Sequence, residues 1–152
     1  MNTINYKQNI PISLSTCWDF FSSPSNLPLL TPPYLGFSND SSEKSMYEGQ
    51  IISHRIKPVL GISILWVTEI THVKPLEYFI DEQRFGPYKF WHHEHRFREI
   101  PNGVEITDII HYMVYGGIFG KLINNLKISK DLEAIFSYRQ NKIRHIFGVY
   151  NT

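Results

Sequence analysis

Cysteine, long apolar runs and charge of one sign are scarce or missing in this sequence of 152 residues. The only cysteine, Cys17, excludes an intramolecular disulfide and favours a reducing compartment. Basic and acidic residues nearly cancel, to a formal net charge of +1, which argues against a surface for nucleic acid. The longest apolar stretch, around Ile62 to Val67, has the length of a strand and is too short to cross a bilayer. We therefore expect no nucleic-acid partner and no stable membrane insertion.

The familiar sequence motifs of catalysis and cofactor binding are also missing. The chain has no G-x-S-x-G, no phosphate-binding glycine loop, no C-x-x-C pair and no dinucleotide fingerprint. No repeat or linker divides it, and its length suits one domain with a full core. Residues 1–10 lack a basic region followed by an apolar run, so no signal peptide is visible. These features predict one domain over 1–152, cytoplasmic and without a cofactor.

The central part of the chain has the pattern of consecutive strands. Apolar and polar residues alternate there, and short turn sequences such as Gly86-Pro87 separate the alternating segments. Short turns between consecutive strands favour an antiparallel sheet. Two short helices are predicted at 15–22 and 26–30, where Ser13 or Ser15 can cap the first. The predicted strands are 2–10, 35–39, 46–57, 62–73, 77–85, 90–100 and 104–114.

From residue 117 to 147 the apolar spacing becomes helical, with one slip near Ser129. A curved antiparallel sheet of six to seven strands around this long helix would cover every apolar face, which predicts an α+β fold. We interpret the basic residues of the helix as a solvated outer face rather than a surface for membrane or nucleic acid. These residues are Lys121, Lys127, Lys130, Arg139, Lys142 and Arg144.

The segment 79–98 is the most informative part of the sequence, and it reads as a hairpin. The even-numbered positions of its second strand are mostly charged or polar, so their face is the solvent side. An opposite face that is half imidazole and half aromatic suits the lining of a pocket better than a dry core. That face carries Trp91, His93, His95 and Phe97.

The strand registers that follow from the assumed turn lengths place further polar residues on the same face. If Asn102-Gly103 is a two-residue turn, Phe97 lies opposite Asp108. The same register puts His95 opposite Ile110 and His93 opposite Tyr112. An even offset around Gly86-Pro87 adds four residues of the preceding strand, Phe79, Asp81, Gln83 and Phe85. The predicted polar group is Asp81, Gln83, His93, His95, Asp108 and Tyr112, framed by Trp91, Phe79, Phe85 and Phe97.

Four uses of this polar group remain open. It could be a satisfied buried network, the polar end of a ligand pocket, a metal site or an acid–base pair. We favour the pocket over the network. We expect no metal, because His93-x-His95 lacks a third ligand at a fixed spacing, while His92 and His111 point to the other face.

Residues along almost the whole chain resemble one superfamily. The resemblance is to the START / polyketide-cyclase-like (SRPBCC) superfamily with the helix-grip fold. It is nearest to bacterial ligand-binding SRPBCC proteins, sometimes described as cell-division-inhibitor-like. The matching segments include Trp18-Asp-Phe-Phe-Ser22, Leu30-Thr-Pro-Pro-Tyr-Leu-Gly-Phe37, Phe79-Ile-Asp-Glu-Gln83, Gly86-Pro-Tyr88, Trp91-His-His-Glu-His95 and Ile135-Phe-Ser-Tyr-Arg139.

The resemblance implies binding of a small, mostly hydrophobic or amphipathic molecule between the sheet and the C-terminal helix. The alternatives are a cyclase, dehydratase or hydrolase that uses His93 or His95 with Asp81 or Asp108, and a protein-interaction module with a vestigial cavity. The loop 31–35 is either a lid over the cavity or a rigid connector. The residues expected to line the cavity are Trp66, Phe79, Asp81, Gln83, Trp91, His93, His95, Asp108, Tyr112 and Phe136.

Overall fold

In the described part of the chain, seven antiparallel strands form one sheet in the order β1-β7-β6-β5-β4-β3-β2. The computed structural model describes residues 1–39, 45–57, 62–116 and 127–151. Alternating burial along β6 and β7 leaves one face of the sheet to solvent and one to the core. The strands are β1 (Asn2–Ile10), β2 (Ser38–Asn39), β3 (Ile51–Ile56), β4 (Ile64–Lys74), β5 (Tyr78–Phe85), β6 (Phe90–Ile100) and β7 (Gly103–Met113).

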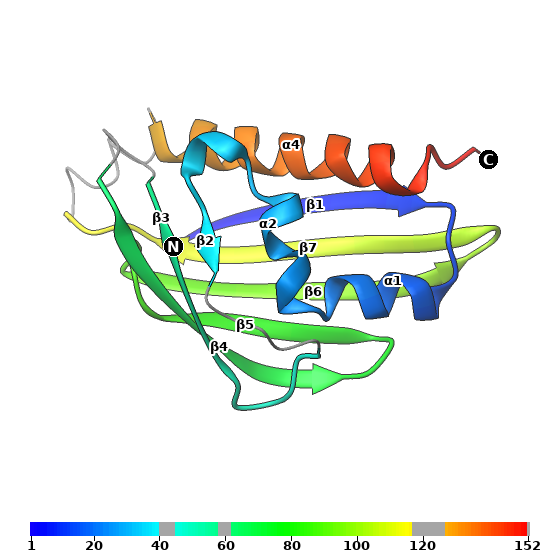
Figure 1. Cartoon of the computed structure of the whole chain (residues 1–152), viewed down its shortest axis with the longest axis horizontal. Coiled ribbons are helices and arrows are strands. Elements are labelled where there is room, and N and C mark those ends of the chain that lie inside the picture. The colour runs from blue at the N-terminus through cyan, green and yellow to red at the C-terminus, as the bar shows by residue number, and fades with distance from the viewer. Residues whose placement is uncertain (40–44, 58–61, 117–126, 152) are drawn as a thin grey trace.

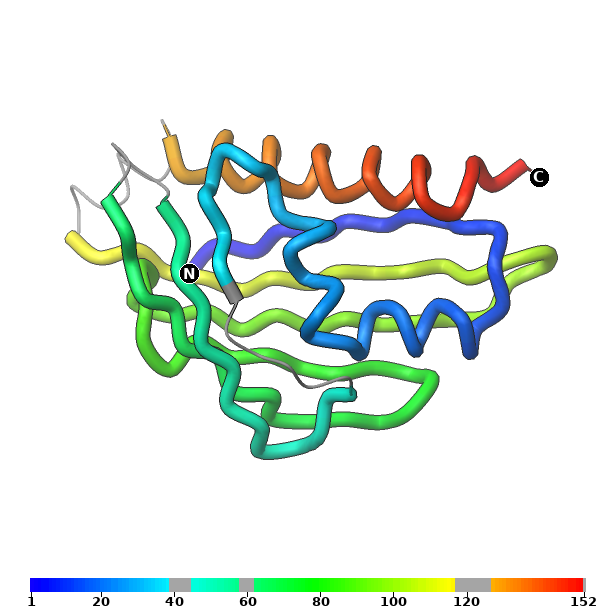
Figure 2. The backbone as a smooth tube through the Cα atoms, viewed as in Figure 1, coloured from blue at the N-terminus to red at the C-terminus, as the bar shows by residue number. Residues whose placement is uncertain are grey.

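The helices pack on the inner face of this sheet. Figure 1 shows the long helix α4 (Ser129–Phe147) beside β1, with α1 (Leu14–Phe21) and α2 (Leu27–Leu30) in front of the central strands. Two short 3₁₀ turns, η1 (Pro24–Asn26) and η2 (Pro33–Leu35), flank α2. Figure 2 shows β1 and α4 running side by side in the same direction. The predicted α+β architecture, a curved sheet gripping a C-terminal helix, is confirmed.

The helix ends follow local chemistry. Ser13 caps α1, because its Oγ accepts a hydrogen bond from the Thr16 backbone N–H at 3.2 Å. Gly148 ends α4 with φ of 92°, where its N–H donates to the Arg144 carbonyl. The predicted helical residues 117–126 lie outside the described residues. None of the described helices is both long and apolar enough to cross a membrane.

Two strand predictions were too long. Leu35 belongs to η2, which Pro33 starts, so β2 begins only at Ser38. β3 begins at Ile51 rather than at residue 46, because a turn precedes it in which the Gln50 N–H donates to the Tyr47 carbonyl. Both corrections lie at the end of the sheet that borders the cavity described below.

The β6–β7 hairpin turns at Pro101-Asn102 rather than at Asn102-Gly103, since Ile100 pairs with Gly103. Asn102 adopts the left-handed conformation, with φ of 61°, which asparagine tolerates. Gly103 serves close packing instead, because a Cβ atom there would lie 2.2 Å from the Ile10 carbonyl oxygen. The true register therefore differs by two residues from the predicted one. It keeps the same residues on the inner face but places His95, not Phe97, opposite Asp108.

Phe85 was also misplaced, since its side chain is 61% exposed. Val67 pairs with Phe85 while the next residue, Thr68, pairs with Gln83. This bulge inserts one residue into β5 and reverses the side-chain parity beyond it.

Among the described residues, most buried apolar side chains fall into two clusters. The first lies under α1 and includes Cys17, Phe21, Phe79 and Phe97. The second lies under the N-terminal half of α4 and includes Trp91, Tyr112, Leu132 and Phe136. Polar side chains of β6 and β7 are buried as well, and with the partly buried Asp81 of β5 they carry the site described next.

Candidate functional site

A cavity of about 470 Å³ lies between the inner face of the sheet, α4 and the segment around α2 and η2. Most of its wall is aromatic or aliphatic. Trp66, Tyr88 and Trp91 form one part of the wall, with the Trp66 and Trp91 ring centroids 5.3 Å apart and nearly perpendicular. Phe20, Phe21 and Phe79 line another part. The wall is therefore mainly apolar, and its polar side chains include a compact group of charged and titratable residues.

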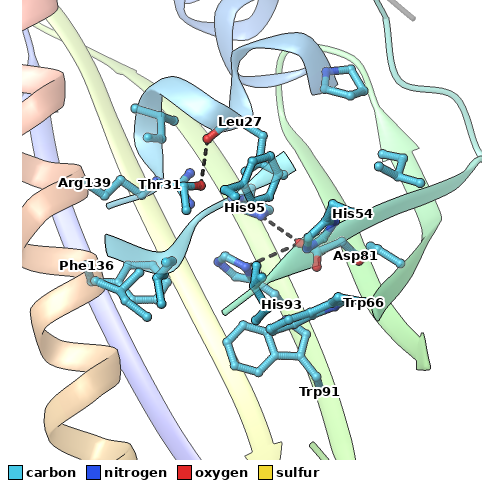
Figure 3. A pocket seen from close by; sticks show the side chains of 18 of the residues that line it. Leu27, Thr31, His54, Trp66, Asp81, Trp91, His93, His95, Phe136 and Arg139 are labelled. Carbon is cyan, nitrogen blue, oxygen red and sulfur yellow. Dashed lines mark hydrogen bonds and ion pairs between the residues drawn. The ribbon is translucent and has the colours of Figure 1, made fainter. Parts of the chain in front are cut away.

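Five charged or titratable side chains form this group, which we call the charged cluster. It consists of Asp81 from β5, His93 and His95 from β6, Asp108 from β7 and Arg139 from α4. Strand pairing sets Asp81 opposite His93, and His95 opposite Asp108. The two imidazole rings lie side by side, with centroids 3.7 Å apart. Figure 3 shows both rings directed at Asp81 while Arg139 and Phe136 reach in from α4.

Each carboxylate of the charged cluster contacts both imidazoles. His95 Nε2 lies 2.9 Å from Asp81 Oδ2, and His95 Nδ1 lies 2.9 Å from Asp108 Oδ1. The second of these is an ion-pair contact that lacks hydrogen-bond geometry. His93 Nε2 lies 3.0 Å from Asp108 Oδ1, and His93 Nδ1 lies 3.4 Å from Asp81 Oδ2. All four ring nitrogens are thus engaged by carboxylate oxygens.

The two histidines have opposite protonation preferences. Burial alone would lower the pKa of His95, but contacts with Asp108 and Asp81 outweigh burial and raise it above 6.5. The pKa of His93 is lowered, first by burial and then by the positive charge on His95. Both nitrogens of His95 face carboxylate oxygens at 2.9 Å, which also favours a protonated ring, because a lone pair would be repelled there. For His95 the geometry and the raised pKa agree on an imidazolium. For His93 the lowered pKa favours the neutral ring.

The two carboxylates remain ionised. Burial would raise the pKa of Asp81, but His93 and His95 outweigh burial and lower it. Burial would also raise the pKa of Asp108, but the Arg139 charge and the contacts with both histidines outweigh burial and hold this pKa well below its usual value. Buried charges are tolerated when each has a partner, and here two anions face two cations.

Arg139 was predicted to lie on the solvated outer face of the helix, and this prediction is wrong. Its side chain is only 11% exposed, and Nη2 lies 3.7 Å from Asp108 Oδ1. The guanidinium carbon lies 5.6 Å from the centroid of the Phe21 ring and 5.9 Å from that of Phe136. The sequence held a signal for this position, because residue 139 follows the buried Leu132 by seven and precedes the buried Ile143 by four.

Seven of the ten residues expected to line the cavity do so: Trp66, Phe79, Asp81, Trp91, His93, His95 and Phe136. The other three do not. Gln83 instead holds the turn after β5, since its amide donates to the Tyr88 carbonyl at 2.7 Å and its oxygen accepts from the Tyr88 N–H. Asp108 contacts the two histidines without lining the cavity, and Tyr112 is buried against Tyr88 and Trp91.

The sequence interpretation missed His54 of β3, a buried residue that lines the cavity. Its ring stacks on Trp66 at 5.6 Å and lies 4.9 Å from the Phe37 ring. Burial lowers the pKa of His54 to about 4, although the nearby Asp81 opposes this shift. Its Nδ1 has no hydrogen-bond partner in the part of the chain that the structure describes. Alternation with the buried Ile52 and Ile56 was the available signal.

The segment 30–35 forms part of the cavity wall through Leu30, Thr31, Tyr34 and Leu35. The Thr31 hydroxyl donates to the Leu27 carbonyl at 2.8 Å, which closes α2. The Lys57 N–H donates to the Leu35 carbonyl at 2.7 Å, which ties the segment to the chain after β3. The segment is therefore part of the cavity wall and is held by hydrogen bonds at both ends, while its role as a lid stays a prediction.

Asp81, His93 and His95 also bring one potential metal-binding atom each to within 4.8 Å of one another. A metal ion there would have to displace the proton of His95 and the mutual contacts of the three groups. The absence of a bound metal therefore stays a prediction, and it is tested below.

Comparison with known proteins identifies the fold. No family model matches the chain, and no curated protein matches it either. Among solved structures, a Chromobacterium violaceum protein aligns with TM-score 0.74 and 11% identity, over 99% of this chain and 100% of its own. Major latex-like protein 151 from Panax ginseng aligns with TM-score 0.68 and 12% identity, over 96% and 97%. The chain has the helix-grip fold. A protein from Thermus thermophilus aligns with TM-score 0.64 and 18% identity, over 95% and 99%. Identities this low establish the fold alone.

Proposed function

We propose that this protein binds a small, mostly hydrophobic molecule in the cavity between the sheet and α4. The observation that carries the proposal is a space of about 470 Å³ whose wall is largely aromatic and aliphatic. Pockets for small ligands are roughly 300–1,000 Å³ and combine apolar walls with a few placed polar groups. The charged cluster and His54 supply such polar groups here.

The aromatic part of the wall suits a flat or chain-like apolar ligand. Tyr88 and Trp91 have ring centroids 4.8 Å apart, and Trp66 packs on both. Rings that support one another in this way keep their positions when a ligand enters, so little side-chain entropy is lost on binding. The resemblance to ligand-binding SRPBCC proteins favours the same class of function.

Two alternatives fit the geometry less well. A catalytic His93 or His95 would need a ring nitrogen directed at a substrate, but carboxylates engage all four nitrogens within 3.4 Å. A protein-interaction module with a vestigial cavity would have side chains filling the space between sheet and helix. The open volume argues for a ligand instead.

A pair of tryptophan variants tests the proposal. Leu27 lines the cavity, whereas Leu29 of the same helix is 46% exposed and does not line it. We expect Leu27→Trp to fill part of the cavity and weaken binding of the neutral fluorophore Nile red at least tenfold. Leu29→Trp should bind it like the wild type. Thermal melts would verify that both variants fold.

Equal affinity of the two variants would contradict binding in this cavity. Native mass spectrometry of protein purified from its own host provides a second test. A retained small molecule, released by organic solvent and lost in Leu27→Trp, is the expected result.

A further inference from the structure

The charges at the base of the cavity balance one another before any ligand enters. Asp81 and Asp108 contribute two negative charges, while Arg139 and the imidazolium of His95 contribute two positive ones. His93 and His54 are neutral, because burial disfavours their charged forms. Asp131, which also lines the cavity, is exposed and adds a negative charge near the solvent. An anionic ligand would therefore bring an uncompensated charge into a buried site.

Arg139 is nevertheless short of hydrogen-bond acceptors. Its contact with Asp108, at 3.7 Å, is too long for a hydrogen bond. Its Nε is buried without a partner among the described residues, and the guanidinium otherwise lies against the Phe21 and Phe136 rings. A guanidinium has five N–H donors, and buried donors need an acceptor from protein, water or ligand. Figure 3 shows the side chain extending from α4 into the region of the cavity.

We propose that the preferred ligand is an uncharged apolar molecule with a carbonyl oxygen, and that Arg139 donates a hydrogen bond to this oxygen. The carbonyl accepts without carrying a formal charge, so it satisfies the guanidinium and leaves the balance of the cluster unchanged. Ketones, esters and amides share this chemistry. The inference rests on the proposed function, because it names the ligand class for the same cavity.

The position of Arg139 makes the interaction selective. The guanidinium lies against two aromatic rings, with guanidinium-to-centroid distances of 5.6 and 5.9 Å. Its orientation is thus restrained before binding, which reduces the entropy lost when a ligand hydrogen bond forms. A carbon in place of the carbonyl oxygen would bury the donors without an acceptor, which disfavours a purely hydrocarbon ligand.

Three naphthalenes of nearly equal size provide the test. They are 2-acetylnaphthalene, its apolar analogue 2-isopropylnaphthalene and the anion 2-naphthoate, each titrated by calorimetry at pH 7. The ketone is expected to bind about tenfold more tightly than the other two, as for one hydrogen bond to a charged donor. In the variant Arg139→Met/Asp108→Asn, which removes one charge of each sign, the ketone should lose this advantage. Lys130→Met removes an exposed cation of the same helix and should keep it.

Each outcome decides between the alternatives. Equal binding of ketone and isopropyl analogue to the wild type overturns the inference while the proposed function stands. Tighter binding of 2-naphthoate overturns it in favour of an anionic ligand. Binding of none of the three overturns both. If the double variant does not fold, the carbonyl stretch of the wild-type-bound ketone decides. A shift to lower frequency than in a hydrocarbon solvent supports the hydrogen bond, and an unshifted band overturns it.

Discussion

Replacing Phe136 by alanine should lower the free energy of unfolding by about 3–5 kcal/mol, the usual range for removing a buried phenylalanine. The ring is only 4% exposed and stacks on Tyr6, with centroids 4.4 Å apart and planes 8° apart. It also packs edge-on against His93 at 5.8 Å. The lost stacking adds about 0.5–1.5 kcal/mol. Because one side of the ring already borders the cavity, the substitution enlarges an existing space, and we expect a value near the lower end, about 3 kcal/mol.

Urea unfolding, followed by tryptophan fluorescence and circular dichroism, measures this change. The slope of the unfolding free energy against urea should stay constant, so that the midpoint reports stability alone. Phe85→Ala is the matched control, because that ring is 61% exposed and its loss should cost less than about 1 kcal/mol. If Phe136→Ala costs no more than Phe85→Ala, then Phe136 does not anchor α4 to the sheet and the assignment of the second core cluster is wrong.

Two further predictions concern the histidines. Replacing His93 and His95 by glutamine should weaken stability or ligand retention and leave the metal content unchanged. About one zinc ion per chain, lost in that double variant, would refute the contact scheme of the charged cluster. Burial lowers the pKa of His54 from 6.5 to about 4. Between these two pH values the unfolded chain binds a proton at His54 that the folded protein does not bind. Stability should therefore fall between pH 6.5 and 4. His54→Phe should flatten that decline in urea midpoints, and an unchanged pH slope would count against a buried neutral His54. The raised pKa of His95 acts oppositely, with stabilisation present below pH 6.5 and lost as the pH rises above its folded pKa.

Strand parity was readable from the sequence alone. It placed Asp81, His93 and His95 on one face, and an error of two residues in the β6–β7 register did not change this. The reason is that side chains alternate with a period of two, so an even shift keeps the face and changes only the partner. The change from alternation to helical spacing likewise predicted α4, because both periods are local properties of the chain.

Only the tertiary structure decided which charges meet. Asp108 and Arg139 are 31 positions apart, and their contact depends on where α4 lies across the sheet. The bulge in β5 turned Phe85 outward, and no local pattern signalled the inserted residue. The volume of the cavity likewise depends on the whole fold. It is the volume enclosed by the sheet and the helices minus the volume of the side chains inside. Such a difference depends on packing over the whole inner face, whereas the sequence reports the neighbours of each residue along the chain.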